Sequence, residues 1–312
     1  MLIYCLGAVA GIALLILLVA YICFRMAFLR QPEPKTPDGY SLPQEDIYIP
    51  YHDKMRAWMQ QTRALPCEEV CITSFDGLKL RGRYYAYAPG APVELMMPGY
   101  RGIAERDLCG GVQRAFSLGR SVLIVDQRAC GNSEGKVITF GIRERLDCLA
   151  WAEYLANRFG KDTKIILTGI SMGAATVMMA SVLPLPENVV GIIADCGYTS
   201  PKEIIKKVIR DMKLPAAAFY PFVKLAARIY GGFDLEKATP IDAMGKCSLP
   251  VFFAHGEADD YVPHQMTLDN YAACKAPKVL LSVPHAGHGL AYVADPSGYI
   301  QALKESAGDY AS

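Results

Sequence analysis

The sequence predicts an α/β protein with a mostly parallel sheet flanked by helices, a helical cap insertion and an N-terminal transmembrane helix. From Cys67 onward, short apolar segments alternate with helical patterns, which is typical of βαβ units. Residues 201–245 interrupt this alternation with two helical patterns and no strand, as an inserted cap would. Residues 2–24 carry no charged side chain. The 312 residues, 52% of them hydrophobic, suffice for one large core.

The elements follow from local patterns. Asp76-Gly77 is a hairpin signal between two strands at the start of the domain. The predicted strands are 69–73, 78–86, 93–97, 121–125, 164–168, 189–194, 251–254 and 279–283. The predicted helices outside the cap are 105–118, 142–159, 172–183 and 290–304.

The apolar segment 2–24 is predicted to be a retained membrane anchor. As a helix it would be roughly 34 Å long, enough for a hydrocarbon core of about 30 Å. A cleaved signal peptide is the alternative, but only Met1 precedes the apolar run and no A-x-A site follows it. Arg25, Arg30 and Lys35 follow the helix, so the positive-inside rule predicts a catalytic domain on the cytoplasmic face. The predicted division is an anchor at 1–30, a Pro-rich juxtamembrane linker and lead-in at 31–62, and one domain at 63–312.

Composition narrows the class of protein further. A formal net charge of +1 gives no basic surface for nucleic acid. The ten cysteines are scattered, without zinc-finger spacing, and are interpreted as reduced thiols, which agrees with a cytoplasmic domain. No dinucleotide, Walker or H-E-x-x-H motif is present, so we expect no cofactor and no metal.

A nucleophile-elbow pattern occurs at Gly169-Ile170-Ser171-Met172-Gly173. A predicted strand precedes it and a predicted helix follows it, which is the context in which such a serine is held exposed above a sheet edge. A serine hydroxyl needs a base and an orienting acid to become nucleophilic. The pattern therefore makes Ser171 the candidate nucleophile.

The acid and the base are sought downstream, because this kind of fold places them in the chain order Ser, Asp, His. Asp259 and Asp260 follow the predicted strand 251–254, and either could be the acid. His285 and His288 follow the last predicted strand, where a loop histidine can reach over the sheet edge. The candidate oxyanion-hole donors are the backbone N–H groups of Met172 and of Tyr100, after strand 93–97.

These motifs resemble the α/β-hydrolase superfamily, and within it the bacterial serine aminopeptidase-like hydrolases. The similarity runs from about residue 68 to 305 and includes Pro98-Gly99-Tyr100-Arg101-Gly102, Asp126-Gln127-Arg128-Ala129-Cys130-Gly131-Asn132-Ser133-Glu134-Gly135, the elbow, His255-Gly256-Glu257-Ala258-Asp259 and Ala286-Gly287-His288-Gly289. The resemblance implies Asp259 rather than Asp260 as the acid, and His288 rather than His285 as the base. Relatives usually carry His-Gly where this chain has Met97-Pro98-Gly99, which changes the oxyanion loop.

The expected function is a serine hydrolase that cleaves an ester or related acyl bond. A peptidase or thioesterase with the same triad is one alternative, and a catalytically silent, membrane-anchored binding protein is another. An amphipathic helix at 202–212 and an apolar helix from Pro221 suggest a lid whose Phe219 and Phe222 contact an acyl chain, with a basic side toward lipid headgroups. Simple packing of both helices on the sheet is the competing interpretation. The sequence leaves the oligomeric state open.

Overall fold

An eight-stranded sheet forms the centre of the protein in a computed structural model, which describes residues 1–32, 36 and 38–306. The strand order is β1-β2-β4-β3-β5-β6-β7-β8. The only antiparallel pairings within this sheet are β1 with β2 and β2 with β4. The strands are β1 (Glu68–Thr73), β2 (Lys79–Tyr85), β3 (Val93–Met97), β4 (Ser121–Val125), β5 (Ile165–Ile170), β6 (Val189–Asp195), β7 (Val251–Gly256) and β8 (Lys278–Val283). The prediction of a mostly parallel sheet is confirmed.

Helices cover both faces of the sheet because side chains alternate along each buried strand. Leu167 and Phe253 point into a core shared with α5 (Glu144–Phe159), α6 (Met172–Ala180) and the segment from α9 (Pro240–Met244). Their neighbours Ile166 and Phe252 point to the opposite face. The remaining helices outside the cap and α1 are η1 (Ile49–Tyr51), α2 (His52–Ala64), α3 (Ala104–Asp107), α4 (Gly111–Ser117), α10 (His264–Ala273), α11 (Ala291–Ala294) and α12 (Pro296–Ser306).

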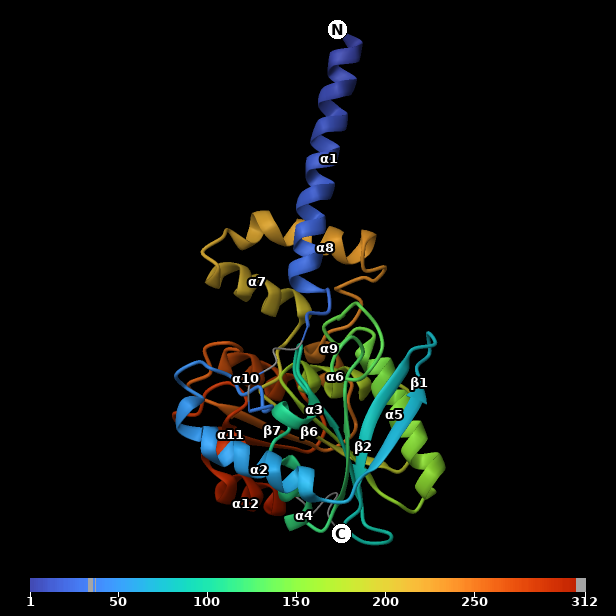
Figure 1. The fold of residues 1–312 in the computed structure, drawn as a ribbon, viewed down its shortest axis with the longest axis vertical. Coiled ribbons are helices and arrows are strands. Elements are labelled where there is room, and N and C mark those ends of the chain that lie inside the picture. The colour runs from blue at the N-terminus through green and yellow to red at the C-terminus, as the bar shows by residue number, and fades with distance from the viewer. Residues whose placement is uncertain (33–35, 37, 307–312) are drawn as a thin grey trace.

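The N-terminal helix α1 (Leu2–Ala27) projects away from the sheet, and the cap helices α7 (Pro201–Asp211) and α8 (Ala216–Ile229) lie at its base (Figure 1). It is the one helix among the described residues that is long and apolar enough to cross a membrane, with a candidate span at Ile3–Ala27. Its last turns pack on α8, and its side chains farther out are exposed. The cap therefore meets the base of this helix directly.

Three predicted helices differ in the structure, each near a proline or glycine. The helix at 105–118 is divided into α3 and α4 at Gly110, whose positive φ of 80° ends regular helix geometry. The helix at 290–304 is interrupted at Asp295, because Pro296 lacks the N–H that a continuous helix needs. The second cap helix begins at Ala216, with Pro221 inside it rather than at its start.

The lead-in segment packs on the domain rather than hanging free. Leu42, Met55 and Met59 are buried in the same cluster as Phe252 and Tyr299. This cluster covers the face of the sheet opposite α5 and α6. Lys35, one of the three basic residues behind the predicted membrane orientation, lies outside the described residues.

Candidate active site

The serine at the elbow sits in a strained turn between β5 and α6. Ser171 has φ 56° and ψ −118°, a left-handed conformation that a non-glycine residue rarely adopts. A Cβ on Gly169 would lie 2.2 Å from the Gly173 carbonyl carbon, and a Cβ on Gly173 would lie 2.0 Å from the Met97 oxygen. Both glycines are therefore required for the turn. The Ser171 N–H donates to the Asp195 carbonyl at 2.8 Å, which joins the turn to β6.

Three of the predicted residues meet at one edge of the sheet. His288 Nε2 lies 2.9 Å from Ser171 Oγ, and His288 Nδ1 lies 2.6 Å from Asp259 Oδ2. Asp259 follows β7 and His288 follows β8, so the ends of three parallel strands supply the group. Because the Asp259 carboxylate accepts, Nδ1 carries the proton and Nε2 is left to accept from the serine hydroxyl.

Their neighbours in the sequence do not join this hydrogen-bonded group, although Asp260 lines the same pocket. Asp260 and His285 are exposed, and neither makes a hydrogen bond to the serine. Of the two acids and two histidines that the residue pattern left open, the geometry thus groups Asp259 and His288 with Ser171.

The carboxyl of Asp259 is held in its charged form. Burial alone would raise its pKa, but hydrogen bonds from His255 and His288 outweigh burial and bring the pKa well below the usual range. The other carboxylate oxygen accepts from the backbone N–H groups of Tyr261 at 2.9 Å and Val262 at 2.8 Å. A charged acid in this position favours one tautomer and one orientation of His288.

A second, fully buried histidine supports this acid and was not identified from the sequence. His255 Nε2 lies 2.9 Å from Asp259 Oδ2 and 3.0 Å from the Val262 carbonyl, both of which accept. Its Nδ1 lies 2.7 Å from the Thr267 hydroxyl oxygen, so both ring nitrogens have partners. The position of His255 at the end of a strand, four residues before the acid, was the available signal.

The predicted oxyanion loop lies beside the serine. A Cβ on Gly99 would lie 3.5 Å from the Ser171 Cβ. The Gly99 N–H is already taken by Asp107 Oδ2 at 3.0 Å, whereas the Tyr100 N–H has no acceptor among the described residues. Met172 is the first residue of α6, where backbone N–H groups have no partner inside the helix. Tyr100 lines the same pocket as Ser171, and Met172 follows it directly, so the two residues stay the predicted oxyanion donors.

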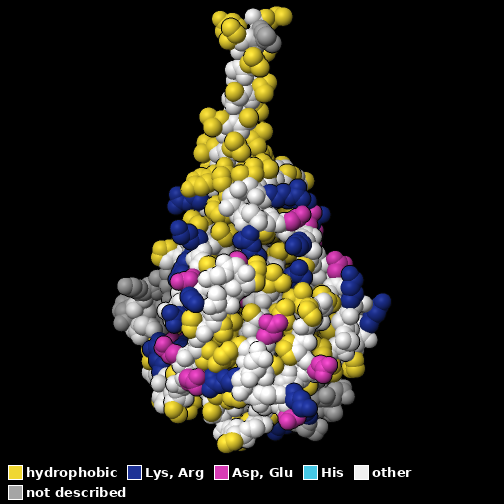
Figure 2. All heavy atoms as spheres, turned by 90° about the vertical axis from the view of Figure 1, so that its right-hand side faces the viewer, with side chains coloured by type: hydrophobic (Ala, Val, Ile, Leu, Met, Phe, Trp, Pro, Cys, Tyr) yellow, Lys and Arg dark blue, Asp and Glu magenta, His cyan; other side chains and the backbone are white. Residues whose placement is uncertain are grey.

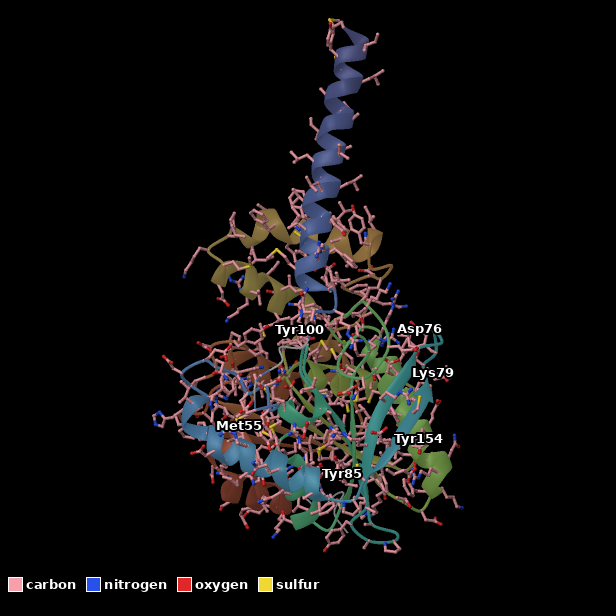
Figure 3. The ribbon with its side chains drawn as sticks, viewed as in Figure 1. Met55, Asp76, Lys79, Tyr85, Tyr100 and Tyr154 are labelled. Carbon is pink, nitrogen blue, oxygen red and sulfur yellow. The ribbon has the colours of Figure 1, made fainter. Side chains whose placement is uncertain are left out.

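The same loop is fastened to the end of α1. The Tyr100 hydroxyl donates to the Ala27 carbonyl at 2.8 Å. Arg101, with a positive φ of 54°, donates to the carbonyls of Met26 at 2.7 Å and Leu29 at 3.2 Å. A cation bound to the last carbonyls of a helix is a favourable C-terminal arrangement. Figure 3 shows Tyr100 directly below the base of α1.

A pocket of about 660 Å³ opens at Ser171 and His288. Much of its wall is apolar and comes from the lead-in segment, α2 and the last helices. The apolar lining residues include Leu42, Ile47, Met55, Leu108 and Val293. The described lining does not include Phe219 or Phe222, which the sequence suggested as substrate contacts. Phe219 instead packs, half-buried, against a core that the cap shares with α1 and α6.

Three possible metal ligands lie close together beside the serine. Cys196, Asp259 and His288 place possible ligand atoms within 4.8 Å of one another. Burial raises the pKa of the Cys196 thiol well above its usual range. The other two residues are already hydrogen-bonded to each other.

One buried carboxyl in the pocket wall lacks a full set of partners. Asp195 Oδ2 accepts from the Tyr299 hydroxyl at 3.1 Å, while Oδ1 has no hydrogen-bond partner among the described residues. Burial raises the pKa of Asp195 to about 6. The folded pocket therefore favours the neutral form of this acid.

Asp195→Asn is expected to stabilise the protein at neutral pH. The pKa of Asp195 in the folded protein lies above the unfolded value near 4. The free energy of unfolding is therefore highest below about pH 4 and falls as the pH rises from about 4 through about 6. Asparagine removes that loss, worth about 2–3 kcal/mol at pH 7.5. Denaturant unfolding at pH 4 and 7.5 measures it, with the exposed Asp162→Asn as control. A gain of equal size at both pH values would contradict this reasoning.

Two curated proteins align with part of the chain. No protein-family model matches the chain. The chain is 28% identical over 191 residues to the uncharacterized protein YqkD of Bacillus subtilis, and 27% identical over 199 residues to protein bem46 of Schizosaccharomyces pombe. These alignments cover 61% and 62% of this chain, but only 63% and 60% of the relatives' own lengths.

A solved structure gives the same architecture over more of the chain. The esterase PF2001 of Pyrococcus furiosus superposes with a TM-score of 0.65 and 21% identity. The match covers 82% of this chain and 95% of that one. At this level of identity the likeness establishes the fold.

Proposed function

Because the chain has the α/β-hydrolase fold, we propose that it is a serine hydrolase that cleaves an ester or a related acyl bond. The observation that carries the proposal is the hydrogen-bonded series Ser171–His288–Asp259 at the end of an apolar pocket. Fold alone does not fix an activity, so the argument depends on this site.

In the proposed reaction, Ser171 Oγ attacks the acyl carbonyl carbon while His288 Nε2 takes the hydroxyl proton. Asp259 stabilises the imidazolium that forms, and the N–H groups of Tyr100 and Met172 stabilise the oxyanion. The tetrahedral intermediate collapses to an acyl-enzyme as His288 returns the proton to the leaving group. A water molecule, deprotonated by His288, then releases the acid and restores Ser171.

The apolar wall favours a small-molecule or lipid-like acyl substrate. Peptides and thioesters undergo the same chemistry and are the alternative substrates. We further propose that α1 anchors the enzyme in a membrane as a single span, with the catalytic domain on the cytoplasmic face, where Arg25 and Arg30 follow the helix.

Activity on p-nitrophenyl esters is expected to rise from acetate to medium chains. Each additional buried methylene contributes up to about 0.8 kcal/mol, so kcat/KM can rise up to about fourfold per carbon until the pocket is full. Met55→Ala, which removes a lining side chain, should flatten this rise. Labelling by a fluorophosphonate probe in the same samples reports whether the serine is reactive at all.

Two matched variants isolate the pocket effect. Met59 lies on the same helix as Met55 and is also buried, but it does not line the pocket. Met59→Ala should lower stability and leave the chain-length profile unchanged, and Phe222→Ala should leave it unchanged as well. A profile that is flat in the wild type, or that changes equally in all three variants, argues against an acyl chain bound along α2.

A further inference from the structure

We infer that the cap helix α8 is immersed in the membrane interface, with one apolar face in contact with lipid. The inference rests on the proposal that α1 spans the membrane. It goes beyond that proposal because it assigns a second membrane-contacting surface, located on the cap of the catalytic domain.

The first argument is the length of α1 compared with the thickness of the membrane. The candidate span itself contains residues that contact the cap: Ala20 is fully buried, and the Tyr230 hydroxyl donates to the Leu17 carbonyl at 3.0 Å. The part of the described span that is clear of the cap, residues 3–16, is roughly 21 Å long. A hydrocarbon core is about 30 Å thick. A bilayer that covers this span therefore reaches the level of the contact with α8.

The second argument is the face that α8 turns away from the protein. Its inner face is buried through Tyr220, Val223, Ala226 and Ala227. Its other face is apolar as well, although it is not covered by protein. Apart from Arg228 in the last turn, the exposed residues of α8 are Ala217, Ala218, Pro221 and Ile229, with Phe222 and Leu225 half-exposed. A surface helix in water normally carries polar residues on this face.

The third argument is the position of charges and aromatic rings. Hydrophobic side chains continue from α1 onto the adjoining part of the molecule, and lysine and arginine side chains lie just below them (Figure 2). Arg25, Lys213 and Arg228 are exposed at the ends of α1, α7 and α8. The rings of Tyr21 and Tyr230 pack 5.3 Å apart where the two helices meet. Tyrosines and basic residues are enriched at this level of a membrane.

The occupant of this face is therefore a phospholipid bilayer with anionic headgroups. On α7, which the sequence suggested for this role, Lys202, Lys206 and Lys207 lie near acidic side chains and Arg210 is exposed. The uncovered apolar face that the inference assigns to lipid belongs to α8.

Quenching of tryptophan fluorescence by brominated lipid tests the inference on the full chain. The protein is reconstituted in phosphatidylcholine–phosphatidylglycerol vesicles, with and without bromine at carbons 6 and 7 of the acyl chains. Phe222→Trp reports on α8, and Ala218→Trp serves if the first variant does not fold. Leu14→Trp in α1 is the control for the span. Tyr87→Trp, two residues beyond Tyr85 at the far end of β2, is the control outside the membrane (Figure 3). The signal of native Trp58 and Trp151 is subtracted using the wild type.

Tryptophan at 222 is expected to lose on the order of half its fluorescence, as at 14, while tryptophan at 87 loses none. Quenching at 14 without quenching at 222 or 218 would place the cap outside the bilayer and overturn the inference, leaving the anchor intact. Absence of quenching at 14 would remove its premise as well. In either case ester turnover by the same samples reports separately on the hydrolase proposal. Tryptophan at 222 could instead be unquenched while a chemical cross-linker joins two chains at this face. The face would then be a dimer contact, and the inference would also be overturned.

Discussion

Ser171→Ala is expected to abolish both ester turnover and labelling by a fluorophosphonate. The hydroxyl is the only group that the proposed mechanism places where it can attack the carbonyl and be deprotonated by His288, 2.9 Å away. Loss of a triad nucleophile lowers kcat by about 10⁴–10⁶-fold, and the remaining rate comes from the oxyanion donors and from binding. Steady-state kinetics on the preferred p-nitrophenyl ester measures the loss.

The matched control is Ser181→Ala, at the opposite end of α6. Its hydroxyl donates only to the Met178 carbonyl, so this variant should keep its activity. Unfolding midpoints for both variants show whether the fold is retained. Wild-type turnover in a folded Ser171→Ala protein would exclude this serine as the nucleophile. A wild-type protein that neither reacts with the probe nor turns over any ester would favour a silent binding protein.

The second large expected effect is a difference in kcat between variants of each proposed catalytic residue and variants of its neighbour in the sequence. Asp259→Asn and His288→Ala should each lower kcat by roughly 10⁴-fold, because the first leaves His288 in the wrong tautomer and the second removes the base. Asp260→Asn and His285→Ala should change kcat less than about threefold, since both side chains are exposed. The four variants are compared by kcat at saturating ester.

The order of the four losses in kcat tests the assignment. A loss for His285→Ala that exceeds the loss for His288→Ala would move the base to the other histidine. Equal, small losses in all four variants would mean that the chemistry does not use this site.

The sequence indicated the group around Ser171 well because that group depends on local turns. The elbow needs glycine at 169 and 173, and the acid and the base each follow a strand directly. A parallel sheet brings such strand ends together whatever the intervening segments do. His255 went unassigned because its role depends on a contact with Asp259 that a strand pattern does not express.

The pocket wall could not be read from the sequence in the same way. Residues 38–48 have no helical or strand period, yet Leu42 and Ile47 line the pocket. Conversely, the apolar spacing around Phe219 and Phe222 identified α8 correctly, but neither residue lines the pocket. Phe219 packs inward, and Phe222 lies half-exposed on the outer face of the helix. Hydrophobic periodicity identifies a buried face without naming what covers it.

Hydrogen bonds from Tyr100 and Arg101 connect the loop beside Ser171 to the end of α1. A bilayer that is thinner or thicker than the span is matched by a change in helix tilt, at a cost of a fraction of a kcal/mol per Å. A flexible tether would absorb such a tilt before it reached the domain. Here two hydrogen bonds join the loop beside Ser171 to Met26 and Ala27 of the helix, and a third joins it to Leu29 just beyond. On the proposal that α1 spans a membrane, a change in its tilt would therefore act on this loop.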